Sequence, residues 1–391
     1  MHLLLRLVRW LLAPLLGTAL LLGGGSWYLA GEISERSLVP HPYSPRASLS
    51  VVAVHPGQIV LTGRAPELRR AGTYGVHWAT GYGQVTGRPR GGAVVTRVFR
   101  LLTGSLPRPG ARAGITGDAF PDDPRVALGV PVRSVTYRSP AGSFPAWFVP
   151  GRGTTWALLV HGKGATRTSM LRMMRVPVSL GMPSLDLTYR NDAGTPRDRT
   201  GHYGWGGTEW EDLDAAVAWA QQHGARRVVL LGASMGGAVV ASFLERSPRA
   251  SLVVATVLDA PVLDVDPVVD LAASRRALPL VGWHVPSPAR WAAKQVASLR
   301  YGVDWDALDH LDDTSWVRVP LLLLHGTADV TVPFATSARL AAAQPALVTL
   351  LPDQGVAHVQ SWNHDPRGYE HALRRFLLRP GGTPVARPLR P

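Results

Sequence analysis

The sequence predicts an α/β fold with a doubly wound, mostly parallel sheet. Six short apolar runs lie between residues 155 and 351, and strands that are covered on both faces read as continuous apolar runs. Helix-forming segments separate these runs, which is the alternation that builds a parallel sheet. The runs are Thr155–Val160, Ser184–Leu187, Val228–Leu231, Leu252–Leu258, Leu321–Leu324 and Leu347–Leu351.

The segments around these strands complete the predicted architecture. Arg133–Arg138 and Phe144–Val149 favour an antiparallel pair at one edge of the sheet. Thr208–Gln222 predicts a core-facing helix, in which Thr208 and Glu211 have the spacing of a capping box. Residues 261–313 exceed a plain crossover and predict a lid, with helical stretches at Ala272–Ala277 and Pro288–Leu299.

The most informative motif follows the third run. Val228–Leu231 leads directly into Gly232-Ala233-Ser234-Met235-Gly236, and the helix-forming run Ala238–Glu245 comes next. A strand, a tight turn and a helix in this order lift the serine hydroxyl out of the turn beside a helix N-terminus. Glycine suits the two flanking positions because a strained serine backbone brings the strand and the helix close together. The motif therefore predicts that Ser234 is a nucleophile.

A serine nucleophile needs a base and an acid that orients the base. In hydrolases built on this turn, the chain order is serine, then Asp or Glu, then His. Asp329 follows the run Leu321–Leu324, and His358 follows Leu347–Leu351. All three residues fall at the C-terminal ends of predicted parallel strands, where doubly wound sheets place their sites.

Other residues compete for each role. Asp259 is the strongest rival for the acid, Asp264 is a weaker one, and Asp329 itself has a second interpretation as a helix cap. Asp353 has an interpretation as a plain turn residue. His364 and His310 are rivals for the base, whereas His325 precedes the acid and suits a supporting role for the Asp329 loop.

The developing oxyanion needs two N–H donors. One comes from the residue after the nucleophile and one from a loop after an earlier strand. These positions are Met235 and, after the strand Thr155–Val160, Lys163. An ordinary strand-to-loop turn at His161-Gly162 is the simpler interpretation. A phosphate-binding loop is a poor one because the Walker spacing is missing.

Taken together, these residues resemble the α/β-hydrolase superfamily. The segments that carry the resemblance are Val160–Gly162, Gly232–Gly236, His325–Asp329, Gly355–His358, Tyr189–Gly194 and Gly207–Asp212. They are most similar to the BEM46-like and ABHD-type serine esterases, and the prolyl oligopeptidase catalytic domain is a more distant relative. The resemblance covers roughly Val130 to Pro380. It implies Ser234 as nucleophile, Asp329 as acid, His358 as base, and Lys163 and Met235 as oxyanion donors.

Composition narrows the functional classes. The net charge is +14, but the arginines are scattered singly and form no basic stripe with aromatic residues, so we expect no nucleic-acid partner. The chain has no cysteine, which excludes disulfides and thiolate metal sites. No HExxH-type histidine spacing is present, and we expect neither a metal nor another cofactor.

The N-terminus predicts a membrane anchor within residues 1–33. Trp10–Ala30 contains 21 residues without a charge, and about 20 helical residues span a bilayer core. Arg6 and Arg9 would stay in the cytoplasm, so the catalytic domain would be extracytoplasmic. A cleaved signal peptide and secretion are the alternative, although Tyr28-Leu29-Ala30 lacks the small residue that cleavage favours.

The remaining segments give the domain plan. Residues 34–46 read as a linker, 47–125 as a small β-rich subdomain, 126–380 as the hydrolase domain and 381–391 as a disordered tail. The β-like pieces of the subdomain are Ser50–Val54, Gln58–Thr62, Tyr74–Trp78 and Ala93–Leu101, followed by a loose stretch at Thr103–Pro124. This subdomain is either an extension without chemistry or a cap that shapes the pocket.

The leading functional hypothesis is a membrane-anchored serine hydrolase that cleaves carboxylic esters, with acyl lipids as one candidate class. A peptidase of the prolyl oligopeptidase type is the first alternative, but the region before Val130 is too short for the propeller of those enzymes. A non-catalytic binding protein on the same fold is the second, and its usual sign is a missing member of the triad. The sequence does not set the oligomeric state.

Overall fold

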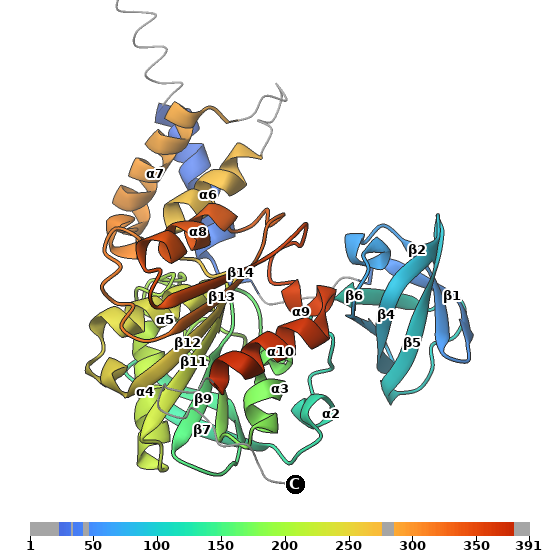
Figure 1. The fold of residues 1–391 in the computed structure, drawn as a ribbon. Helices are drawn as coiled ribbons and strands as arrows, with labels where there is room; N and C mark the ends of the chain where they lie inside the picture. Colours follow the sequence, from blue (N-terminus) through green and yellow to red (C-terminus); the bar gives the residue numbers. More distant parts are fainter. Residues whose placement is uncertain (1–22, 33, 42–46, 276–284, 379–391) are drawn as a thin grey trace, which may run out of the picture.

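The structure, a computed structural model, describes residues 23–32, 34–41, 47–275 and 285–378 (Figure 1). The predicted tail and most of the predicted anchor lie outside these ranges. In the ranges just given, no helix combines the length and the apolar character needed to cross a membrane.

An eight-stranded sheet forms the centre of the C-terminal body, in the order β14-β13-β12-β11-β9-β10-β8-β7. The pairs that join β10, β9, β11, β12, β13 and β14 are parallel, whereas β8 and β7 add an antiparallel edge. The doubly wound, mostly parallel sheet predicted from the apolar runs is therefore confirmed, and it is the sheet that the resemblance to α/β-hydrolases implies. The strands are β7 (Arg133–Ser139), β8 (Gly142–Val149), β9 (Thr155–Val160), β10 (Ser184–Leu187), β11 (Arg227–Ala233), β12 (Val253–Asp259), β13 (Leu321–Gly326) and β14 (Val348–Asp353).

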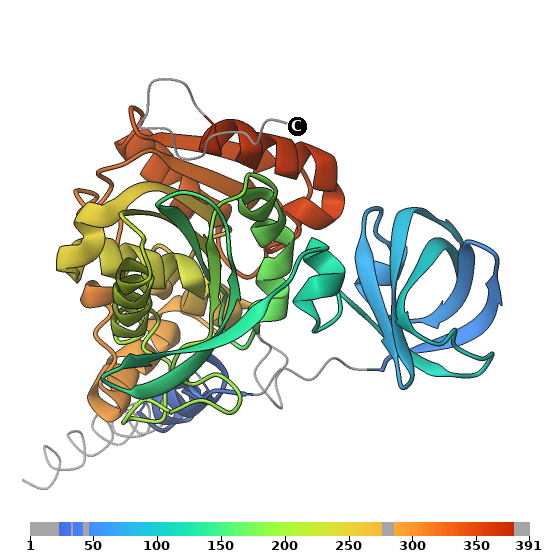
Figure 2. The ribbon, with the colours of Figure 1, turned by 90° about the horizontal axis from the view of Figure 1, so that it is seen from below.

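Helices cover both faces of this sheet (Figures 1 and 2). Residues of α4, α5 and α8 pack on one face, and residues of α2, α3 and α10 pack on the other. The helices are α2 (Pro124–Leu128), α3 (Leu171–Ser179), α4 (Trp210–Gln222), α5 (Met235–Arg246), α6 (Val265–Ser274), α7 (Ser287–Tyr301), α8 (Phe334–Ala343), α9 (Ser361–His364) and α10 (Pro366–Leu377). Because both faces are covered, β9, β10 and β13 are buried along their whole length.

Helix α4 does not begin as its sequence predicts. The expected capping box of Thr208 and Glu211 is absent, because Glu209 occupies the N-cap and no side chain caps the helix. Glu209 is fully buried and accepts the backbone N–H groups of Gly204 and Gly206, at 2.8 and 3.0 Å. Glu209 therefore holds the loop before α4 and does not close the first turn of the helix.

Residues 49–116 contain a closed barrel of six strands in the order β1-β2-β5-β4-β3-β6. Its strands are β1 (Leu49–His55), β2 (Gln58–Gly63), β3 (Tyr74–Trp78), β4 (Gly81–Gly91), β5 (Val94–Gly104) and β6 (Arg112–Thr116). Strands β4 and β6 were missed, since glycines interrupt their alternation of apolar and polar residues. One of these glycines is required by packing, because a Cβ at Gly83 would lie 2.2 Å from the Phe99 ring.

A buried arginine occupies the inside of the barrel. Arg97 lies on β5 between the inward-facing Val95 and Phe99, and its side chain has no exposed surface. The guanidinium donates to five backbone carbonyls at 2.9 to 3.3 Å, those of Glu67, Leu68, Arg70, Gly72 and Gly87. Burial lowers the pKa of Arg97, and the carbonyls compensate for most of its lost hydration. The short 3-10 helix Pro66–Arg69 is tied to the barrel by the same contacts.

A cap lies beyond the C-terminal ends of the parallel strands (Figure 1). It comprises α6, α7 and a helix at residues 23–32. Helix α6 starts at Val265 instead of the predicted Ala272, because the side chain of Asp264 accepts the Asp266 N–H at 3.0 Å and caps it. The expected end at Ala277 lies outside the described residues. Ion pairs of Arg290 with Asp270 and of Lys294 with Asp266 join α7 to α6.

The segment predicted as a linker is partly folded onto the body. Ser34–Leu38 forms one π-helical turn, and Leu38 is buried in the core cluster of the hydrolase domain. The Leu38 carbonyl accepts the Tyr203 N–H at 2.7 Å. The chain therefore runs from the cap along the hydrolase body before the barrel begins.

Candidate active site

The strand, turn and helix around Ser234 have the predicted arrangement. Strand β11 ends at Ala233, α5 begins at Met235, and Ser234 between them has φ of 53° and ψ of −121°. A left-handed backbone at a non-glycine residue is strained and is held here by its surroundings. A Cβ at Gly232 would lie 2.7 Å from the Gly236 carbonyl oxygen, and one at Gly236 would lie 2.1 Å from that of Val160. Only glycine fits at either position.

Three side chains that are distant in sequence meet at this turn. The Ser234 hydroxyl lies 2.8 Å from Nε2 of His358, and Nδ1 of His358 lies 2.6 Å from Oδ2 of Asp329. In this geometry the hydroxyl donates to Nε2 while Nδ1–H donates to the carboxylate. The imidazole is therefore oriented to accept the serine proton, which is the relation that nucleophilic catalysis requires.

The surroundings of Asp329 keep it ionised. Its Oδ1 accepts the backbone N–H groups of Thr331 and Val332 at 2.8 and 3.0 Å. Burial alone would raise its pKa, but hydrogen bonds from His325 and His358 outweigh burial and hold the pKa well below the usual range. His325 also contacts the Ser337 hydroxyl at 2.8 Å. It supports the Asp329 loop, in agreement with its interpretation from the sequence.

The rival residues are engaged elsewhere. Asp259 is buried at the end of β12 and accepts the Tyr369 hydroxyl at 3.1 Å, and Asp264 caps α6. Asp353 is the last residue of β14 rather than a loop residue, and it pairs with His364 at 3.0 Å. His310 pairs with Glu245 at 2.7 Å. None of these five groups takes the place of Asp329 or His358 beside Ser234.

The end of β9 lies against the nucleophile. A Cβ at Gly162 would come within 2.9 Å of the Ser234 Cβ, so only glycine allows this approach. His161 is fully buried, and its two ring nitrogens face the Gly162 carbonyl and the Asp192 carboxylate, both at 2.9 Å. Both partners are acceptors, an arrangement that favours the protonated ring. Burial opposes this charge, but Asp192 reverses the effect and raises the pKa of His161.

Lys163, the next residue but one, is held by its side chain. Its ammonium lies 5.4 Å from the centre of the Trp205 ring and 5.9 Å from that of Tyr203, and it donates to the Ser37 carbonyl at 3.4 Å. Burial lowers its pKa to about 8. The Lys163 side chain thus links the predicted oxyanion loop to the segment that comes from the cap. Met235, the other predicted donor, is the first residue of α5 and is fully buried.

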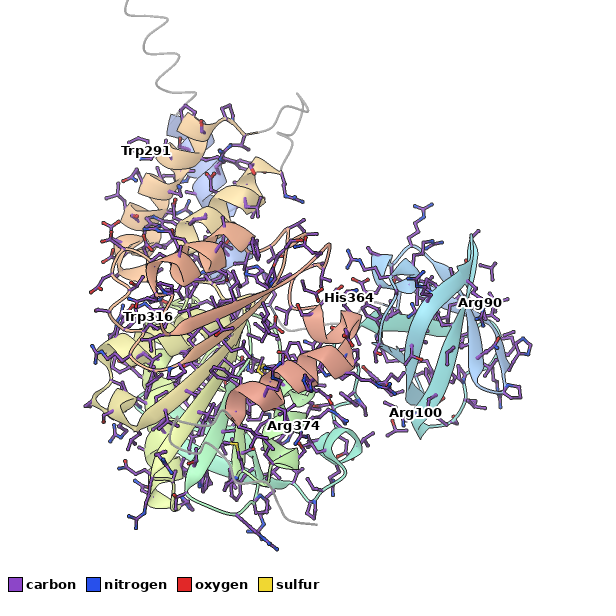
Figure 3. The ribbon with its side chains drawn as sticks, in the orientation of Figure 1. Arg90, Arg100, Trp291, Trp316, His364 and Arg374 are labelled. Carbon is purple, nitrogen blue, oxygen red and sulfur yellow. The ribbon has the colours of Figure 1, made fainter. Side chains whose placement is uncertain are left out.

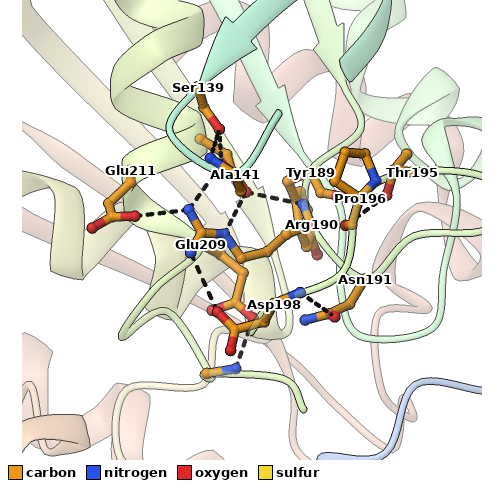
Figure 4. A network of polar contacts seen from close by, with 12 residues as sticks. Ser139, Ala141, Tyr189, Arg190, Asn191, Thr195, Pro196, Asp198, Glu209 and Glu211 are labelled. Atoms are coloured by element: carbon orange, nitrogen blue, oxygen red, sulfur yellow. Dashed lines mark hydrogen bonds and ion pairs between the residues drawn. The ribbon is translucent and has the colours of Figure 1, made fainter. Parts of the chain in front are cut away.

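An ionic network supports the loop after β10 (Figure 4). Arg190 donates to Asp212 at 2.8 Å, to Glu211 at 2.8 Å and to Asp198 at 3.3 Å. Burial would lower its pKa, but the hydrogen bonds to Asp212 and Glu211 raise it instead. The neighbouring Tyr189 stacks on His161 at 4.5 Å and donates its hydroxyl to the His161 carbonyl at 2.8 Å. The network therefore fixes the loop against which the end of β9 rests.

The loop that carries His358 is attached to the barrel. Val359 has a left-handed φ of 51°, and Nη1 of Arg172 donates to its carbonyl at 3.2 Å and also to the Asn363 side-chain oxygen. Nδ2 of Asn363 donates to the carbonyls of Thr73 and Gly117 in the barrel, at 2.7 and 2.8 Å. The Thr73 N–H donates in return to the Asn363 carbonyl at 2.8 Å.

A second contact joins the barrel to the residue two positions after His358. Oε1 of Gln360 accepts from Arg70 at 3.0 Å. Figures 1 and 2 show the barrel beside α9, and the hydrogen bonds of Gln360 and Asn363 join it there to the α/β body. We did not predict the roles of Arg172, Gln360 and Asn363. The one available signal was a charged residue inside the apolar run Met170-Leu171-Arg172-Met173-Met174.

No metal site accompanies this constellation. Within the described ranges, no group of three or more His, Cys, Asp or Glu side chains is arranged to hold a metal ion.

Comparisons with known proteins agree with this geometry. A model of the prolyl oligopeptidase family matches residues 190–367, which include Ser234, Asp329 and His358. The Pyrococcus furiosus esterase Pf2001 is similar in structure, with a TM-score of 0.53 and 18% identity over 66% of this chain and 94% of the esterase. A putative hydrolase from Agrobacterium vitis S4 gives a TM-score of 0.48 and 19% identity over 63% of this chain and 99% of that protein. A search among curated proteins found no match.

The likeness to the Pyrococcus esterase supports the fold, and the matched segment agrees with a hydrolase built on a nucleophilic serine. The barrel lies outside the matched segment. The chain has the α/β-hydrolase fold, its residues 190–367 match the prolyl oligopeptidase family, and Ser234, His358 and Asp329 are arranged as a serine hydrolase requires.

Proposed function

We propose that the protein is a membrane-anchored serine hydrolase that cleaves carboxylic esters through an acyl-enzyme. The observation that carries the proposal is the continuous contact from Asp329 through His358 to the Ser234 hydroxyl, at 2.6 and 2.8 Å. These are the distances at which a proton can pass from a nucleophile to its base. The strained turn at Ser234 and the glycine at 162 keep the hydroxyl accessible to an acyl group.

The reaction follows from this geometry. His358 Nε2 takes the Ser234 proton while Oγ attacks the carbonyl carbon, and the ionised Asp329 stabilises the imidazolium that forms. The backbone N–H groups of Met235 and Lys163 hold the oxyanion. His358 then donates its proton to the leaving alcohol, and water, activated by the same imidazole, hydrolyses the acyl-enzyme. Loss of one oxyanion donor costs about 3 kcal/mol of transition-state stabilisation in enzymes of this kind.

A fluorophosphonate probe tests the assignment of the nucleophile. The wild-type chain should be labelled, whereas Ser234→Ala should not. Ser242→Ala is a matched control, because Ser242 is also buried but contacts His310 and lies away from the triad. Labelling of Ser234→Ala at the wild-type level would refute the proposal.

Peptide hydrolysis is the alternative that the family match supports. Peptidases of the prolyl oligopeptidase type carry a propeller, whereas residues 49–116 here form one small barrel. We therefore favour esters. Rates on p-nitrophenyl acyl esters and on proline-containing p-nitroanilides separate the two, and a faster anilide reaction would reverse our preference.

The membrane anchor is the least constrained part of the proposal. It is supported by the uncharged run Trp10–Ala30 and by Arg6 and Arg9 before it, which favour a cytoplasmic N-terminus and an extracytoplasmic catalytic domain. Alkaline carbonate extraction of membranes from cells that express the full chain tests it. An integral anchor stays in the membrane pellet, and release of the intact chain into the supernatant would contradict it.

A further inference from the structure

Large exposed apolar side chains gather on the cap. Trp27 and Tyr28 of the helix at residues 23–32 are 57% and 52% exposed, and Trp291 and Leu299 of α7 are 63% and 90% exposed. Arg300 of α7 lies over the Trp27 ring at 4.3 Å, so the two helices are neighbours (Figures 1 and 3). We call the solvent-exposed side of these two helices, which carries the four side chains, the cap face. Exposed patches of this kind mark interaction surfaces.

The opposite side of the helix at residues 23–32 packs on the rest of the protein. Ser26 is 4% exposed, Ala30 is fully buried, and Leu29 packs on the main hydrophobic core. The last third of the uncharged run Trp10–Ala30 thus packs with one side on the folded protein. Residues 10–22 remain, and even as a continuous helix these 13 residues would extend only about 20 Å. A bilayer core is about 30 Å thick.

The difference between the length of residues 10–22 and the thickness of a bilayer core indicates that lipid covers the cap face. If residues 10–22 enter a bilayer, the exposed side of residues 23–30 must enter its polar boundary as well, and α7 beside them follows. The side chains found there suit that layer, because Trp and Tyr concentrate at the interface between lipid and water and Arg snorkels to it. The acidic residues of α6 are neutralised, since Asp270 pairs with Arg290 and Asp266 with Lys294.

The cap is also joined directly to the nucleophile. The segment that leads from β12 into α6 starts at Ala260, and its Val262 N–H donates to the Ser234 carbonyl at 3.0 Å. On the other side, Lys163 is bonded to Ser37, five residues after the end of the helix at 23–32. The active site and the cap are therefore connected by direct hydrogen bonds.

We propose that the cap face lies in the headgroup layer of a lipid bilayer and that the active site takes its acyl esters from that bilayer. The second half of this inference rests on the proposed ester hydrolysis, whereas the first half does not. In this arrangement the folded cap contacts the lipid as well as the anchor does. The cap therefore adds the membrane contact that residues 10–22, which are shorter than the bilayer core, do not supply alone.

The absence of cysteine allows a direct test. Leu299→Cys, labelled with the environment-sensitive dye NBD, reports on the cap face in the full chain. Val98→Cys, which replaces a 45% exposed valine on the barrel, is the matched control. The full chain is reconstituted into phosphatidylcholine vesicles, with and without phosphatidylglycerol. We expect a blue shift and a rise in intensity at position 299 relative to the same protein in detergent-free amphipol, and neither change at position 98. Equal responses at the two positions would overturn the lipid contact.

Activity provides the second arm. Trp291→Ser combined with Leu299→Ser should lower hydrolysis of a long-chain diacylglycerol in vesicles by about fivefold or more, because the apolar contact with the bilayer is lost. Hydrolysis of soluble p-nitrophenyl butyrate should stay at the wild-type rate, and the barrel pair Val94→Ser with Val98→Ser should change neither. An unchanged vesicle rate in the cap variant would refute lipid delivery. Failure of the wild type on both esters would instead refute the proposed ester hydrolysis and leave the dye result to decide the membrane contact.

Discussion

The two appendages of the hydrolase body are attached in different ways. The barrel meets the body through directional hydrogen bonds between buried groups, with Asn363 and Arg172 at the centre. The cap meets it through apolar packing of residues such as Leu38, Ala293 and Val268, with ion pairs added within the cap. Hydrogen bonds fix distances and angles, whereas apolar contacts tolerate sliding.

This difference matches what each appendage contacts in the site. The barrel junction leads to the His358 loop, whose position must be accurate to fractions of an ångström for proton transfer. The segment leading into the cap reaches the triad through the backbone, where the Val262 N–H donates to the Ser234 carbonyl, and we expect the cap to govern substrate access more than triad geometry. We therefore expect changes at the barrel junction to reduce kcat and changes in the cap to alter stability or substrate access.

The largest effect should come from Asn363→Ala. It removes the donor to the carbonyls of Thr73 and Gly117, and it leaves Nη1 of Arg172 with the Val359 carbonyl alone. We expect a loss of about 2 to 4 kcal/mol in the free energy of unfolding and a kcat lowered by between about tenfold and a hundredfold, with little change in KM. Steady-state kinetics and urea unfolding measure both quantities. Ser242→Ala should destabilise the body while leaving kcat unchanged, and an equal loss of kcat in that control would remove the distinction between the two regions.

A pair of glycines in the barrel sharpens the comparison. Gly72 has φ of +121°, and a Cβ there would lie 2.3 Å from the Asn363 carbonyl oxygen. Gly57 has φ of +71° and open space around it. Gly57→Ala should cost about 1 kcal/mol of stability through backbone strain alone and leave kcat unchanged. Gly72→Ala should displace α9 and lower kcat by about tenfold. The comparison fails if both variants have the same kcat.

In the cap, we predict an effect on stability that depends on pH. Burial and the neighbouring carboxylate of Asp309 raise the pKa of Asp264 to about 6. A carboxyl group with a raised pKa in the folded state stabilises fully below the unfolded value and loses that contribution as pH rises through 6. Asp264→Asn keeps an N-cap for α6 and removes the charge. At pH 8 the variant should be more stable than the wild type by about 1 to 2 kcal/mol, and this difference should vanish near pH 4. Unfolding by urea at both pH values tests it, and a difference that does not depend on pH would contradict it.

The smallest effect concerns the outer contact of the barrel junction. Arg70 is partly exposed and donates to Gln360, whereas Arg69 beside it donates only to carbonyls of the barrel, those of Gly63 and Gly92. Arg70→Met should lower kcat by about twofold, since exposed polar contacts contribute little. Arg69→Met should leave kcat at the wild-type value. A reversed order of the two variants would show that Gln360 plays no part in positioning His358.

Much of the hydrolase domain could be predicted because its signals are local. The parallel strands are continuous apolar runs, and five adjacent residues, Gly232–Gly236, predict the turn at Ser234. The order Ser, Asp, His then selected Asp329 and His358, which the structure brings to hydrogen-bonding distance. Strand β4 was missed because its glycines, needed for packing, remove the alternating pattern.

The contacts that hold the His358 loop could not be predicted from local patterns. Arg172 is separated from Asn363 by 191 positions, and Asn363 from Thr73 by 290. Such pairings depend on how two domains dock, and no periodicity in either segment encodes it. The capping box at Thr208 failed for a related reason, because the Glu211 carboxylate accepts from Arg190 and the N-cap of the helix is Glu209.

Arg97 also limits what the barrel can do. Barrels that enclose even one small molecule have about eight strands, and here a guanidinium and its five carbonyl partners occupy a barrel of six. The interior around Arg97 is therefore filled by groups of the protein itself. An effector that acts through the barrel would therefore bind its outer surface, where the barrel contacts Asn363.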